Sequence, residues 1–168
     1  MVGIVCPGAD IVRIKAWFEI RDDKGNLEVA VENDILDKGI RWIMSAIANN
    51  LIADGYPANA AKYIHWGSGS TPVDVVNDFR LESFTGSLGQ VTTTTKTSDI
   101  LISMSLSYTT GADPIYINEM AIACTANNPV NSTNYVNAVI DRAVLVSTQV
   151  IPPNTTKTII YYMKIYTT

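Results

Sequence analysis

The sequence is poor in the residues that most often carry chemistry. Its 168 residues include one histidine and two cysteines, and charged residues make up only 17%, against roughly 25% in typical soluble domains. One histidine and two distant cysteines are too few ligands for a structural zinc site. The 12 basic and 16 acidic residues give a net charge of −4, which disfavours direct binding to a nucleic-acid backbone.

Long apolar runs are also missing. The first ten residues have no basic region and too short an apolar run, so we expect no signal peptide and synthesis in the cytoplasm. No stretch approaches the roughly 20 apolar residues of a membrane-spanning helix, so we expect no membrane contact. Cys6 and Cys124 are best interpreted as two free thiols, although a disulfide between them stays open.

Alternating apolar and polar residues predict strands along most of the chain. Residues 11–20 alternate cleanly, Asp22–Asn26 has turn chemistry, and alternation resumes from Leu27. This pattern predicts a β-hairpin over residues 11–32. Short alternating stretches separated by turns continue through a β-rich remainder at 62–168, most clearly at 99–108.

One segment changes to a helical period. Leu36, Ile40, Ile43, Ile47 and Leu51 fall on one face, which predicts an amphipathic helix over about 35–53 that lies against a sheet. The length suits a single domain over 1–168. We therefore expect a mainly β fold, an antiparallel, jelly-roll-like β-sandwich of seven or eight strands with this helix packed on it.

Candidate catalytic and metal-binding groups do not form a known pattern. His65 precedes the loop Gly67–Ser70, but this loop fits neither a nucleophile elbow nor a phosphate-binding loop. Asp22–Asn26 lacks the spacing of a calcium loop, so a turn is the simpler interpretation. Glu82, Glu119 and Asp141 offer no spacing that selects a glycosidase pair. We expect no catalytic residue, no metal, no cofactor and no enzyme activity.

Two sites place charge inside otherwise apolar strands. Glu119 stands in one such stretch, and the pair Asp141–Arg142 stands in another. A buried ionised group requires a partner of opposite charge. We therefore expect Glu119 or Asp141 to contact Arg142 or Arg80, in a structural role.

Aromatic residues gather in the last strand, which is apolar on both faces. Tyrosine is enriched at protein interfaces and also serves as a stacking surface for sugars. We favour a self-association interface, with the core of the domain and a sugar platform as alternatives. The interface residues are Ile160, Tyr161, Tyr162 and Tyr166.

The order of short motifs resembles that of small structural proteins of tailed bacteriophages and related viruses. In that pattern a hairpin and a helix are followed by a glycine-rich turn, an acidic stretch, an "E-x-(G/A)-(L/I)" strand and a strand that contains "(D/A)-R". The corresponding stretches here are Asn33–Arg41, Tyr63–Pro72, Asn77–Glu82, Ile117–Ile122 and Val139–Leu145. Ala121 stands where glycine is common in the fourth motif.

The resemblance implies a β-sandwich component of the virion that decorates a capsid or belongs to a tail. Its partners would be copies of itself and other virion proteins, such as a major capsid or tail protein. The alternative that we keep is a β-sandwich module that binds carbohydrate or a receptor, which an exposed row of aromatic residues would favour.

Overall fold

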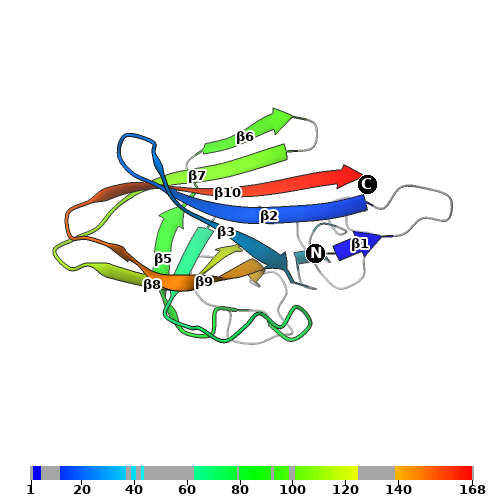
Figure 1. Ribbon diagram of the computed structural model, residues 1–168, viewed down its shortest axis with the longest axis horizontal. Helices are drawn as coiled ribbons and strands as arrows, with labels where there is room; N and C mark the ends of the chain where they lie inside the picture. Colours follow the sequence, from blue (N-terminus) through cyan, green and yellow to red (C-terminus); the bar gives the residue numbers. More distant parts are fainter. Residues whose placement is uncertain are drawn as a thin grey trace.

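The chain folds into antiparallel strands that form one continuous, strongly curved sheet (Figure 1). The structure is a computed structural model. It describes residues 2–4, 12–36, 39–40, 43, 63–78, 80–91, 93–98, 101–124 and 139–167. The strands are β1 (Val2–Ile4), β2 (Val12–Arg21), β3 (Leu27–Ile35), β4 (Tyr63–Gly67), β5 (Phe84–Gln90), β6 (Thr93–Ser98), β7 (Leu101–Thr109), β8 (Ile115–Ala123), β9 (Val139–Ile151) and β10 (Thr156–Thr167).

The order across the sheet is β5-β4-β8-β9-β3-β2-β10-β7-β6, and β1 pairs with β2. The link between β3 and β9 is short, because only Asp34 and Ile35 are in register with Arg142 and Asp141. Figure 1 shows β6, β7, β10 and β2 side by side, with β8 and β9 on the other side of the molecule. Because β5 also contacts β7, near the opposite end of the order, the sheet is nearly barrel-like.

The predicted hairpin is confirmed as β2 and β3, which are joined by a tight turn. Asp22 Oδ1 accepts hydrogen bonds from the backbone N–H groups of Lys24 at 2.9 Å and Asn26 at 2.7 Å. Gly25 has a φ of +85°, a conformation that glycine adopts without steric cost. The aspartate therefore closes the turn, as the simpler interpretation of this segment expects.

Alternation places one face of each strand in a common core. Phe18 of β2, Leu106 of β7 and Ile159 of β10 are buried with Ile122 of β8 and Ile140 of β9. Residues from distant parts of the order therefore meet inside the curve of the sheet. The expectation of a mainly β, antiparallel fold is confirmed.

The helix expected over about 35–53 is not supported. Ile35 is the last residue of β3, and most of the segment lies outside the described residues. Within the described part, the Ile40 N–H donates to the Leu36 carbonyl at 3.0 Å. Among the described residues no helix has the length and apolar character needed to cross a membrane.

Candidate functional site

A buried arginine organises the largest group of polar contacts in the described residues. Arg142 of β9 is in register with Ala121 of β8, and its side chain is 2% exposed. Its Nε donates to Glu119 Oε2 at 2.9 Å, its Nη1 to Asp78 Oδ2 at 2.7 Å, and its Nη2 to the Thr71 carbonyl at 3.1 Å. Glu82 Oε2 lies 3.7 Å from Nη2. The guanidinium therefore joins the sheet to the segment between β4 and β5.

Glu119 of β8 is fully buried and accepts hydrogen bonds on both oxygens. Besides Arg142, its carboxylate accepts from the backbone N–H groups of Gly69 at 3.1 Å, Ser83 at 2.7 Å and Glu82 at 3.1 Å. These four donors match the roughly four acceptor positions of an ionised carboxylate. Folding thus compensates the burial of this charge, which would otherwise cost several kcal/mol.

Two glycines let the loop approach this carboxylate. A Cβ on Gly67 would lie 2.4 Å from the Ser83 carbonyl oxygen and 2.5 Å from Glu119 Oε1. A Cβ on Gly69 would lie 2.6 Å from the same Oε1. The glycine-rich turn is therefore explained by close approach to Glu119.

The outer part of the loop is held by carboxylates of its own. Glu82 accepts from the Thr71 hydroxyl and, at 2.9 Å, from the Thr71 backbone N–H. These hydrogen bonds, the side-chain bond first, lower the pKa of Glu82. Asp74 accepts from the Asn77 side chain at 2.8 Å and from the Asn77 backbone at 3.1 Å, which lowers its pKa in the same way.

We call the set Gly69, Thr71, Asp78, Glu82, Glu119 and Arg142 the loop clasp. Glu119–Arg142 is one of the alternative contacts expected from the charges inside apolar strands, and it is confirmed. Asp78 and Thr71 did not stand out in the sequence, because both are common in loops. The two central side chains, Arg142 and Glu119, are 2% and 0% exposed, and through them the clasp fixes the loop to the sheet.

Asp141, the neighbour of Arg142, points to the opposite side of the sheet. Its Oδ2 accepts a hydrogen bond from the Tyr161 hydroxyl at 2.9 Å, and both residues are 0% exposed. Burial raises the pKa of Asp141 to about 8, and the hydrogen bond from Tyr161 opposes this shift. Burial also raises the pKa of Tyr161. This pair connects β9 and β10 through the core.

The structure corrects the position of one predicted interface residue. Tyr161 is a core residue, tilted against Phe18 at 5.1 Å between ring centroids, and it offers no surface to a partner. Its neighbours on β10, Ile160, Tyr162 and Tyr166, are half-buried on the outer face. Strand parity separates the two sets, because successive residues point to opposite faces.

His65 lies inside the fold rather than at the surface. It is 0% exposed, and its ring meets Phe84 edge-on at 5.0 Å between centroids. This aromatic contact assigns the side chain a packing role. Of the two cysteines, Cys124 is buried, and Cys6 lies outside the described residues.

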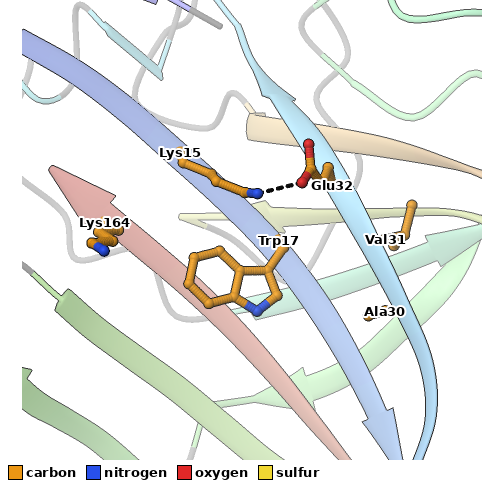
Figure 2. A pocket seen from close by; sticks show the side chains of 6 residues that line it. All are labelled: Lys15, Trp17, Ala30, Val31, Glu32 and Lys164. Carbon is orange, nitrogen blue, oxygen red and sulfur yellow. Dashed lines mark hydrogen bonds and ion pairs between the residues drawn. The ribbon is translucent and has the colours of Figure 1, made fainter. Parts of the chain in front are cut away.

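A groove opens on the outer face of β2, β3 and β10 (Figure 2). Its volume is about 440 Å³, and its lining residues are Lys15, Trp17, Ala30, Val31, Glu32 and Lys164. Trp17 stacks on Tyr162 with ring centroids 4.7 Å apart and planes inclined by 13°. Lys15 forms an ion pair with Glu32. None of the lining residues was singled out from the sequence, where only the alternation along their strands was visible.

Comparison with protein-family models, with curated proteins and with solved structures gives no match for this chain.

Proposed function

We propose that this chain is a non-enzymatic structural protein of a virus particle, a capsid-decorating or tail subunit. The supporting observation is the loop clasp. Four of the stretches that carry the resemblance to phage structural proteins, 63–72, 77–82, 117–122 and 139–145, each contribute at least one residue to it. Short motifs can match independently by chance, but these four depend on one another in a single buried network.

The chemistry of the clasp is consistent with a building block. Arg142 and Glu119 engage main-chain groups and carboxylates that belong to the fold itself. A long loop is thereby held on the sheet at a fixed position, as a surface for stable assembly requires. The residues that carry the resemblance thus hold the loop in one conformation, which is a structural role rather than a catalytic one.

We further propose that the curved sheet is a β-sandwich. One layer would contain β6, β7, β10, β2 and β3, and the other β9, β8, β4 and β5. Among the described residues the two layers join in register only at Asp34 and Ile35, and the Tyr161–Asp141 hydrogen bond spans the core between them.

Self-association is assigned to the outer face of β10. Ile160, Tyr162 and Tyr166 present apolar area there, and β10 lies between β2 and β7 rather than at an edge. An obligate interface of this kind typically buries more than about 2,000 Å² in total. The neighbouring strands β7 and β2 would therefore take part.

Sedimentation velocity tests this assignment. We expect the purified chain to sediment as an oligomer, and Tyr162→Asp to sediment as a folded monomer, because an unpaired charge in an interface costs several kcal/mol. Tyr116→Asp is the matched control, since Tyr116 is 54% exposed on β8, away from this face. A wild-type monomer at high concentration, or a Tyr162→Asp variant that keeps the oligomeric mass, would overturn the interface.

A further inference from the structure

The geometry of the groove in Figure 2 points to a ligand, and we propose that it binds a sugar ring that carries a carboxylate, as in a uronic acid unit of an acidic glycan. Its volume of about 440 Å³ falls in the usual range for small-molecule sites. The inference does not rest on the proposed virion role, but the groove shares the outer face of β10 with the self-association interface proposed above, so occupancy of the groove and that interface exclude each other.

The indole of Trp17 provides a preorganised stacking surface. One of its faces is engaged by Tyr162, at 4.7 Å between centroids. Its Nε1 donates to Glu19 Oε1 at 3.2 Å, and Arg21 holds the same glutamate through Nε at 2.9 Å and Nη2 at 2.6 Å. The ring is therefore fixed in orientation, and its second face is available to an apolar face of a ligand, such as the C–H face of a pyranose.

Space beside the indole comes from a small residue on the neighbouring strand. Glu32 is directly opposite Trp17 in the register of β2 and β3, and Ala30 is the next outward residue along β3. Ala30 is exposed, so its methyl group leaves a hollow next to the ring. A larger side chain at this position would fill the groove.

The charge pattern selects an anionic ligand. Lys15 and Lys164 are directly opposite each other in the register of β2 and β10, an arrangement that costs stability unless an anion lies nearby. Glu32 pairs with Lys15, whereas Lys164 lies over the ring of Tyr166, with Nζ 5.7 Å from its centroid. A carboxylate on the ligand would neutralise the charge of the Lys164 ammonium.

The same pattern favours a sugar acid over a nucleic acid. The side chain of Glu32 is 73% exposed, so its carboxylate is available to accept hydrogen bonds from hydroxyl groups. The same carboxylate would repel a phosphate backbone, whose binding depends on several clustered cations. A sugar ring with hydroxyl groups and a single negative charge could stack on the indole, pair with a lysine and donate hydrogen bonds to the glutamate at the same time.

Saturation-transfer NMR with methyl β-D-glucuronide and methyl β-D-glucoside tests the proposal. These probes differ only at C6, which is a carboxylate in the glucuronide and a hydroxymethyl group in the glucoside. We expect transfer to the glucuronide and at least about fivefold weaker binding of the glucoside. Trp17→Ala should remove the signal, and Lys164→Gln should weaken the glucuronide about fivefold without affecting the glucoside. Raising the salt concentration should reduce only the binding of the glucuronide.

Tyr116→Ala and Lys24→Gln are the matched controls, because both residues are exposed outside the groove, and both variants should bind like the wild type. Circular dichroism checks that each variant is folded. If Trp17→Ala unfolds, Lys164→Gln still tests the groove. Equal binding of the two probes, binding unaffected by Lys164→Gln, or no binding of either would overturn the proposal. Binding of a thymidine octanucleotide in place of the glucuronide would also overturn it.

Discussion

Asp141 shows how a single residue sets the response of the fold to pH. Burial raises its pKa from an ordinary 3.8 to about 8, so the folded protein keeps a proton that the unfolded chain releases. The stabilisation from this proton is complete below about pH 4 and is lost as the pH rises to about 8. Each pKa unit of difference corresponds to about 1.4 kcal/mol.

We expect the free energy of unfolding to fall between about pH 4 and pH 8, and this fall to be largely absent in Asp141→Asn. The amide is close in shape to the protonated carboxyl and does not titrate. Urea unfolding at a series of pH values measures both curves. Parallel curves for the two proteins would contradict the assignment of a buried, protonated Asp141.

Gly69 tests the close approach of the loop to Glu119. We expect Gly69→Ala to destabilise the protein by about 1–3 kcal/mol, because its Cβ would lie 2.6 Å from Glu119 Oε1 and 2.7 Å from the Glu82 Cβ. Gly111→Ala is the control, since a Cβ there meets nothing within 4 Å. Thermal unfolding compares the two variants, and equal midpoints would show that the loop does not lie as described.

At single residues, the sequence predicted contacts correctly where a buried charge requires a partner. The charges inside apolar strands predicted that Glu119 or Asp141 would contact Arg142 or Arg80, because an ionised group is not stable alone in a core. The structure selects Glu119 and Arg142 from these alternatives. The prediction failed for Tyr161, because a strand with apolar residues on both faces does not reveal which face is inside. Only the pairing of Tyr161 with Phe18, which is itself buried, settles that question.

At the level of elements, the loop clasp couples the conformation of the segment between β4 and β5 to the stability of the sheet. Glu119 accepts from three backbone N–H groups of that segment as well as from Arg142. A glutamine would present an NH₂ group to some of these donors and would leave Arg142 without its buried counter-charge.

We expect Glu119→Gln to cost about 1–3 kcal/mol for the buried groups left without partners. Hydrogen exchange should accelerate first at the amides of Gly69, Glu82 and Ser83, which lose their acceptor. Glu32→Gln, which breaks an exposed pair, should change stability by less than about 1 kcal/mol. Exchange that accelerates equally over the whole sheet would show that the loop has no separate dependence on the carboxylate.

The elements themselves were predictable to the extent that their residues alternate. The hairpin of β2 and β3 and the strands β7, β8 and β10 follow the apolar period, and the threonine-rich β6 lies at the end of the strand order. Strand β5 was missed because its seven residues include Gly86 and Gly89 and only Leu88 is buried. Its pairing with β4, rather than local preference, makes it a strand.

At the scale of the whole molecule, the fold brings distant segments to a common core and a common clasp. Residues 69 and 142 meet near Glu119, and residues 141 and 161 meet across the core. Such contacts depend on strand order, which alternation does not determine. The sequence therefore predicted the class of fold and one ion pair, while the groove on β2, β3 and β10 became visible only in the assembled sheet.

The central claim is that this chain is a component of a virus particle. Density-gradient fractionation of the native source, with mass spectrometry across the fractions, tests it most directly. We predict that the chain comigrates with nuclease-resistant particles at a fixed ratio to a capsid or tail protein. Recovery only in the soluble fraction, as a monomer, would contradict the claim.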